Sequence, residues 1–316
     1  MSRRILLSLG LCLAASTALA ATPPARTAPA HAKGAGNGSG KVAAKPAQKA
    51  AAKPAQKATA KPARKATAKA GAKSSGARAA PKLPALTAEK IVQRNVAARG
   101  GLTAWRSVET LTMSGQLDAG GKPTVELPFV MKLKRGHKSR LEIPFNGKTA
   151  VQVYDGTRGW KVRPFLNRNE VEPYTEAEAR SAAGWAELDG PLIDHERKGT
   201  KVRLAGTEVV DGKPAYELEL TFRNGERRHL WIDGKTFLER KIDGEPRKLD
   251  GKLRPVAIHY REFRTENGLT TPRVLETAAE GVPQHHTLKI ERVVVNAPVD
   301  DALFGKPKLA VASVGR

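Results

Sequence analysis

From residue 108 onward, apolar and polar residues alternate with a period of two, which is typical of β-strands that have one buried face. Asp-Gly and Asn-Gly pairs, as at 211–212 and 224–225, predict tight turns between antiparallel strands. We predict about eleven strands, within residues 108–117, 124–135, 138–145, 149–156, 200–210, 213–222, 227–233, 237–243, 255–268, 269–281 and 285–296. A further hairpin is expected over 154–162.

Two segments have helical spacing instead. Thr87 is expected to cap a helix whose apolar positions in 91–98 share one face and which ends at Gly100-Gly101. A second helix is predicted within 175–199, with a break at Gly190-Pro191. The fold class that follows is mainly β with α, a curved antiparallel sheet with helices on its concave side.

The first 20 residues have the features of an export signal. Arg3 and Arg4 precede the short apolar run 5–15, and an A-x-A site predicts cleavage after Ala20. The compartment that we expect is the periplasm. Cys12, the single cysteine, lies inside this signal, so the mature chain is predicted to have no disulfide, catalytic thiol or cysteine ligand.

Residues 21–85 have a composition that is unlike the rest of the chain. They hold fourteen Lys and Arg and no Asp or Glu, and an eight-residue unit is repeated within 45–68. Apolar residues are too few there to offset the entropy of ordering the chain, so we predict a disordered basic tail. Its expected partner is an anionic membrane surface or wall polymer, since export makes chromosomal DNA unavailable. A solvated spacer is the alternative.

The folded part lacks the usual patterns of chemistry. Adjacent His285 and His286 point to opposite faces of a strand, and no H-x-x-x-H or G-x-S-x-G pattern occurs. We therefore predict no catalytic residues, no metal and no cofactor. Basic residues in 131–140 are interpreted as a solvated hairpin tip, with a headgroup or partner contact as the alternative.

Five large apolar residues have two interpretations, namely ordinary core packing or the lining and gate of a ligand cavity. Leu188 is three residues after Trp185 and Leu192 is four after Leu188, so a helix bent at Gly190-Pro191 would place them on one face. The candidate ligand-binding residues are Trp160, Trp185, Leu188, Leu192 and Ile193.

Several motifs resemble, in the same order, those of the LolA-like superfamily of outer-membrane lipoprotein-sorting proteins. They are "YDGTRGW", "ELDGPLIDHERKG", "VDGKPAYELELTFRNGERRHLWIDGKTFLERK", "FRTENGLTTPRVLE" and "ERVVVNAPVDDALFGKP", which together cover about residues 87–307. The resemblance implies a LolA/LolB-like half-open β-barrel whose helices cover an apolar cavity for acyl chains.

The predicted function is that of a periplasmic carrier of lipid or lipoprotein acyl chains, without enzymatic activity, expected to be a monomer. The alternatives are an envelope-stress sensor that contacts a membrane protein and a wall-binding protein that acts through its tail. The predicted division is a signal peptide at 1–20, the tail at 21–85, a lipid-binding domain at 86–307 and a C-terminal tail at 308–316.

Overall fold

The computed structural model describes residues 83–118, 125–249 and 251–308. The predicted signal peptide, nearly all of the basic tail and most of the C-terminal tail lie outside these residues. No helix among the described residues has the length and apolar character needed to cross a bilayer.

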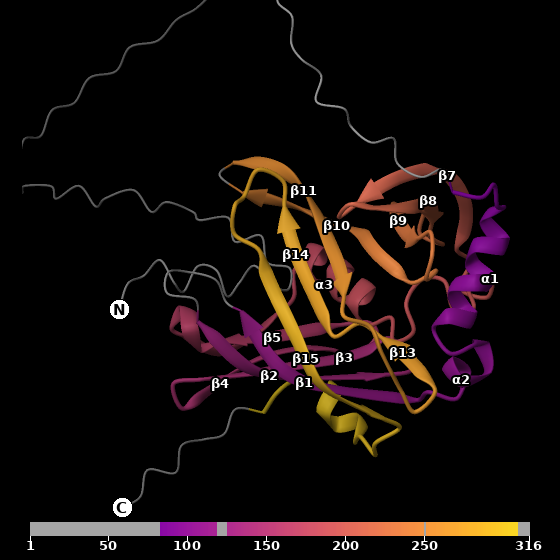
Figure 1. Ribbon diagram of the computed structural model, residues 1–316. Coiled ribbons are helices and arrows are strands. Elements are labelled where there is room, and N and C mark those ends of the chain that lie inside the picture. The colour runs from indigo at the N-terminus through magenta and orange to yellow at the C-terminus, as the bar shows by residue number, and fades with distance from the viewer. Residues whose placement is uncertain (1–82, 119–124, 250, 309–316) are drawn as a thin grey trace, which may run out of the picture. The chain divides into compact units, whose positions relative to one another are not determined.

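The described chain begins with two short helices and continues mainly as strands (Figure 1). Its elements are α1 Ala88–Ala98, α2 Leu102–Arg106, β1 Thr110–Asp118, β2 Glu126–Lys134, β3 Lys138–Phe145, β4 Lys148–Tyr154, β5 Gly159–Arg163, η2 Pro164–Leu166, β6 Arg168–Pro173, α3 Glu176–Trp185, β7 Lys201–Val210, β8 Lys213–Thr221, β9 Arg227–Asp233, β10 Glu239–Leu249, β11 Lys252–Arg261, β12 Arg264–Glu266, β13 Leu269–Thr271, β14 Val274–Ala279, β15 His286–Val295 and η3 Asp301–Phe304.

Thirteen strands form one open sheet in the order β6-β5-β4-β3-β2-β1-β15-β14-β11-β10-β9-β8-β7, and β12 pairs with β13 beside it. Neighbouring strands of the sheet run antiparallel, and β6 and β7 are its free edges. A bulge between Ser114 and Gly115 lies at the β1–β15 junction, where a Cβ on Gly115 would lie 1.9 Å from the Lys289 carbonyl oxygen. Bulges bend and twist strands, which helps to curve the sheet around its inner face.

The predicted curved antiparallel sheet is thus confirmed. Among the described residues, β6 was missed because "RNEVEP" does not alternate cleanly. The segments 255–268 and 269–281 each contain two strands rather than one, since β12 and β13 are only three residues long.

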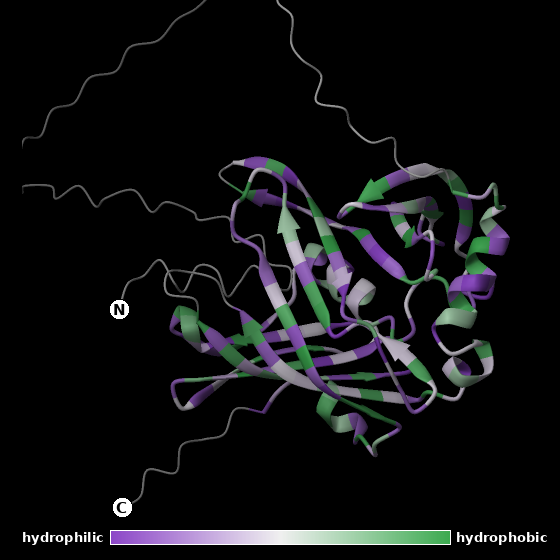
Figure 2. Ribbon diagram, in the orientation of Figure 1, coloured by the Kyte–Doolittle hydropathy of each residue, from purple (hydrophilic) through white to green (hydrophobic). Residues whose placement is uncertain are grey.

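Hydropathy alternates along many strands (Figure 2), and the inner face of the sheet carries two clusters of buried side chains. The first core cluster includes Trp105, Val108, Leu111, Leu117, Phe129, Met131, Leu133, Leu141, Ile143, Leu188, Ile193, Leu288 and Ile290. The second core cluster consists of Ile91, Val92, Leu192, Tyr216, Leu218, Leu220, Leu230, Ile232, Ile242 and Ile258. Each cluster therefore packs on the inner face of one half of the curved sheet.

Side-chain hydrogen bonds cap the starts of the short helices. The Thr87 hydroxyl accepts a hydrogen bond of 3.2 Å from the Lys90 amide at the start of α1, as predicted. The Asp300 carboxylate likewise accepts one of 2.9 Å from the Ala302 amide at the start of η3. The second predicted helix is shorter than expected, because α3 ends at Trp185 and residues 186–199 form turns.

Candidate functional site

The helix α3 lies between the two halves of the sheet (Figure 1). A complete capping box starts it, in which the Thr175 hydroxyl accepts from the Glu178 amide while the Glu178 carboxylate accepts from the Thr175 amide at 2.8 Å. Its buried positions are Glu178, Ser181 and Ala182, and Ala186 follows directly. The helix therefore covers the sheet with small side chains and one carboxylate.

A small hollow lies between α3 and the strands β2, β3 and β4. Met131, Leu133 and Leu141 line one side of it, and Tyr174 and Trp185 are also at its wall. Its volume is about 20 Å³, which is room for about one water molecule. The expected cavity of acyl-chain size is therefore not open at this place, because α3 occupies the space that a chain would need.

The structure separates the five predicted site residues. Trp185 lies at the hollow, whereas Leu188 and Ile193 belong to the first core cluster and Leu192 to the second. Trp160 packs on the opposite face of β5, against a cluster that includes Phe304 of η3. The predicted common helical face does not form, because the helix stops at Trp185 and the chain turns.

The segment after α3 is anchored by a buried carboxylate. Asp189 is 1% exposed and accepts hydrogen bonds from Arg135 Nη1 at 2.6 Å and from Lys198 Nζ. Its backbone oxygen accepts from Arg99 Nη1 at 2.8 Å. Burial by itself would raise the pKa of Asp189, but the Lys198 ammonium and the Arg135 guanidinium outweigh it and hold the pKa below its usual value. The cation beside Glu187 lowers its pKa by less than burial raises it, so its pKa lies above its usual value.

Arg135 also corrects the interpretation of residues 131–140 as a solvated tip. Its Nε donates to the Val108 oxygen at 2.8 Å and its Nη2 to the Trp105 oxygen at 2.6 Å. Its side chain is 30% exposed. The guanidinium therefore ties the hairpin between β2 and β3 to α2 and to Asp189.

A second set of charges attaches α3 itself to the first half of the sheet. Lys161 on β5 donates to both carboxylate oxygens of Glu178, at 2.6 Å for Oε2, and the two side chains are 8% and 5% exposed. Beside this pair, Arg163 Nη2 donates to both oxygens of Glu172 at 2.9 and 2.7 Å. Burial would raise the pKa of Glu172, but the Arg163 guanidinium lowers it on balance.

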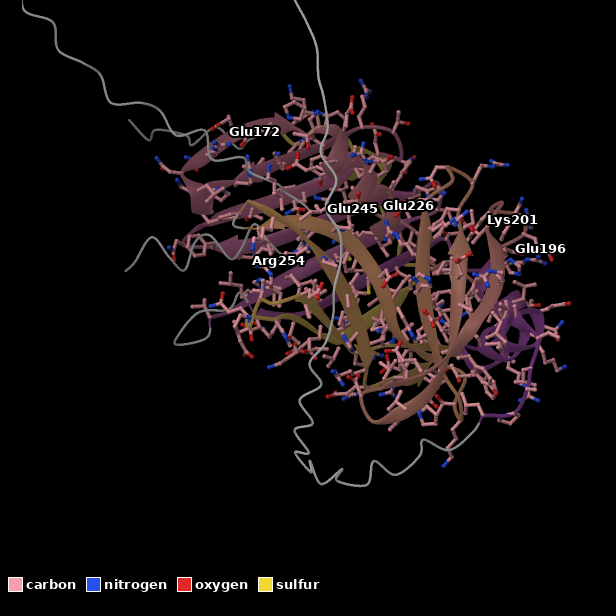
Figure 3. All side chains as sticks on the ribbon, turned by 90° about the horizontal axis from the view of Figure 1, so that it is seen from above. Glu172, Glu196, Lys201, Glu226, Glu245 and Arg254 are labelled. Atoms are coloured by element: carbon pink, nitrogen blue, oxygen red, sulfur yellow. The ribbon has the colours of Figure 1, made fainter. Side chains whose placement is uncertain are left out.

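On its other side α3 approaches Arg228 of β9, whose guanidinium would lie 3.8 Å from a Cβ on Gly184. Arg228 pairs with Glu226 at 2.5 Å and with Glu245 at 3.6 Å. Figure 3 shows these two glutamates close together. The helix is thus bordered by charged groups of both halves of the sheet.

Sequence reasoning missed Lys161, Glu178, Asp189 and Arg135. The T-x-x-E pattern of a capping box in residues 175–178 is a signal that Glu178 is held at a helix start, although not that it meets a lysine. The motif "ELDG" contains Asp189, but its partners lie far away in the sequence.

Neither a family model nor a curated protein sequence matches the chain. Similar solved structures include a DUF1329 family protein from Desulfovibrio piger, with a TM-score of 0.48, 16% identity, and coverage of 69% of this chain and 97% of that one. A LolA superfamily protein from Nitrosomonas europaea has a TM-score of 0.45 and 16% identity, over 70% and 99% of the two chains. A Vibrio parahaemolyticus domain assigned as an outer membrane lipoprotein-sorting protein has a TM-score of 0.45 and 11% identity, over 69% and 95%.

The predicted resemblance is confirmed to the extent that LolA superfamily and lipoprotein-sorting proteins are among the structural neighbours. At these identities and TM-scores, the ligand of this chain has to be argued from its own residues.

Proposed function

We propose that this protein is an exported carrier that binds acyl chains of lipids or lipoproteins against the inner face of its sheet. In this proposal the ligand displaces α3, and Trp185 and Leu188 lie beside the acyl chain. Leu192, Ile193 and Trp160 serve the packing around that chain.

The observation that carries the proposal is the mismatch between α3 and the surface that it covers. The sheet presents Met131, Leu133 and Leu141 to the hollow, whereas along its middle α3 offers the small Ser181 and Ala182, with Glu178 near its start and a single large apolar side chain, Trp185, at its end. Small side chains bury little apolar area, so apart from the half-buried Trp185 the helix contributes little hydrophobic energy where it lies. A hydrocarbon chain would bury more on the same strands.

The magnitudes favour exchange of the helix for a ligand. Leaving water stabilises each methylene of an acyl chain by about 0.8 kcal/mol, so twelve of them supply roughly 10 kcal/mol before losses of motion. Releasing the two methyl groups of Ala182 and Ala186 costs roughly 2 kcal/mol on the same scale, and releasing the half-buried Trp185 costs about 2 kcal/mol more. The Lys161–Glu178 pair resists the release as well, which keeps the empty protein closed.

The predicted export signal and basic tail complete the proposal. Cleavage after Ala20 would deliver the chain to the periplasm, where the fourteen cations of residues 21–85 attract an anionic membrane surface or wall polymer. A membrane protein that receives the cargo is the further partner that we predict. The tail then keeps a monomeric carrier near the place of transfer.

The test combines lipid uptake with a report on α3. Native mass spectrometry of the full chain after incubation with envelope lipid extract is expected to show bound lipid. A Cys12→Ser, Ala182→Cys variant places a single thiol under α3, where Ala182 is 9% exposed. Its reaction with a thiol reagent is expected to become faster when lipid is bound, because α3 is displaced.

Ala215→Cys in the same background is the matched control. Ala215 is 0% exposed and packs with Val210 and Trp231, in a cluster separate from those at α3. Its labelling is expected to stay slow with and without lipid. Absence of uptake would refute the carrier and leave the predicted interaction module, and uptake with unchanged labelling at residue 182 would refute the role of α3.

A further inference from the structure

One row of residues crosses the first half of the sheet under α3. The strand register pairs Met131 with Leu141, Leu141 with Gln152, and Gln152 with Lys161. The first three of these residues line the hollow. Over three strand spacings, or about 14 Å, the inner face therefore changes from hydrocarbon through an amide to an ammonium group.

The ammonium end of this row loses one of its two neighbouring carboxylates when α3 is displaced. Lys161 and Arg163 are the two buried cations of β5, with side chains 8% and 5% exposed. Glu172 belongs to β6, at the edge of the sheet, where it pairs with Arg163 and is also the strand partner of Lys161 (Figure 3). Glu178 is carried by α3, so displacement of the helix removes the carboxylate that pairs with Lys161.

Without Glu178, Lys161 and Arg163 share the single carboxylate of Glu172, and an excess positive charge on the inner face is unfavourable. The open form of the carrier would therefore gain most from a ligand that brings its own anion to Lys161. We infer that the ligand is an amphiphile with an anionic headgroup, a carboxylate or a phosphate, which pairs with Lys161 in place of Glu178 while its hydrocarbon lies along Leu141 and Met131. The inference rests on the proposed function.

This arrangement discriminates between headgroups. A neutral headgroup of the same chain length leaves Lys161 and Arg163 to share Glu172, and a cationic headgroup is repelled by the excess positive charge. A free small anion has the charge but buries no hydrocarbon on Leu141 and Met131, so it lacks the larger part of the binding energy. Charge and chain are both required at one site.

Isothermal titration calorimetry of the full chain with four probes tests the inference. The probes are dodecanoate and dodecyltrimethylammonium below their critical micelle concentrations, 1-dodecanol below its solubility limit, and acetate. Dodecanoate is expected to bind about tenfold tighter than 1-dodecanol, which is what one charge-assisted hydrogen bond supplies. No binding is expected for dodecyltrimethylammonium or acetate.

The double variant Lys161→Met/Glu178→Gln removes both charges together, so that it leaves no buried ion unpaired and folds. Its dodecanoate and 1-dodecanol affinities are expected to become equal. Lys148→Met is the matched control, because Lys148 is an exposed lysine of β4 that donates to Asn169 at 2.9 Å, and it should keep the tenfold preference.

The outcomes separate the two proposals. Equal affinities in the natural protein, a tenfold preference that survives in the double variant, or acetate binding as tight as that of dodecanoate would each overturn the anionic headgroup. The carrier function would stand in the first two cases, since an acyl chain is still bound. Failure of every amphiphile to bind would overturn the carrier function itself.

Discussion

Replacing Asp189 with asparagine tests whether the segment after α3 is held by charge. The substitution keeps the size of the side chain but removes the negative charge. Asp189 is 1% exposed and is the shared partner of Arg135 and Lys198. An amide oxygen still accepts one hydrogen bond, whereas Arg135 loses its counterion and Lys198 keeps only Glu187.

The size of the effect follows from burial. Removing one partner of a buried ion pair costs about 3–5 kcal/mol, because the remaining charge is left uncompensated. The side chains of Arg135 and Lys198 are 30% and 20% exposed, so water takes up part of their charge. We therefore expect the lower end, a loss of about 3 kcal/mol in the free energy of unfolding at pH 7.

The loss should depend on pH with a defined sign. The pKa of Asp189 is lowered in the folded protein, so its contribution to stability is present above its unfolded pKa and is lost as pH falls through its folded pKa. The difference between the natural protein and Asp189→Asn is thus expected to be constant near neutrality and to shrink below about pH 4.

Urea unfolding followed by tryptophan fluorescence at several pH values measures this difference. Glu187→Gln is the matched control, since Glu187 lies two residues away and also contacts Lys198, at 3.0 Å. Burial raises the pKa of Glu187, so folding disfavours its charged form and the neutral amide should cost less than about 1 kcal/mol. A similar loss in both variants, or a loss for Asp189→Asn that does not change with pH, would refute the reasoning.

Three further predictions concern other parts of the chain. Lys161→Met is expected to lower the free energy of unfolding by about 3 kcal/mol, and adding Glu178→Gln should restore most of that loss. A double-mutant cycle in urea measures this, and additive effects of the two substitutions would contradict it. Gly100→Ala is expected to lower the free energy of unfolding by at least about 2 kcal/mol, because the φ of Gly100 is +112° and the new Cβ would lie 2.1 Å from the Gly268 oxygen. Calorimetry measures this loss, and an unchanged Tm would contradict the prediction. Deleting residues 21–82 should abolish salt-sensitive cosedimentation with anionic vesicles while Tm stays unchanged, whereas retained cosedimentation would assign binding to the folded part.

The open antiparallel sheet was predictable because alternation and turn pairs are local signals. The caps at Thr87 and Asp300 were predictable for the same reason, since each involves residues two or three positions apart. The side of the sheet on which a strand residue lies was not. Trp160 and Lys161 are neighbours on a strand that is covered on both faces, by η3 and by α3, so both are well packed and alternation does not say which one faces the helix.

The hollow could not be predicted for a different reason. Its volume depends on how closely Trp185 and Ala182 approach the strands, to within the size of one methyl group, and a pattern of residue types does not contain that information. The path of the polypeptide after α3 could not be predicted from the sequence either. Gly190 has a φ of +75° and Asp194 one of +51°, so the backbone turns where a bent helix was expected and sends Leu192 away from its predicted neighbours.

The two parts of the insert between β6 and β7 are attached in different ways, and this difference decides which part can move. Residues 188–193 place Leu192 and Ile193 in the two core clusters and Asp189 in a buried set of charges, so their release would open both halves of the sheet. The helix α3 contributes small side chains, the single buried carboxylate of Glu178 and, at its last residue, the half-buried Trp185. Opening is therefore cheapest about the turn that follows Trp185, with α3 leaving the first half of the sheet while the segment after it stays. A ligand that compensates for the loss of Glu178 then needs to stabilise only this one displacement, which is within the reach of a single acyl chain with a charged head.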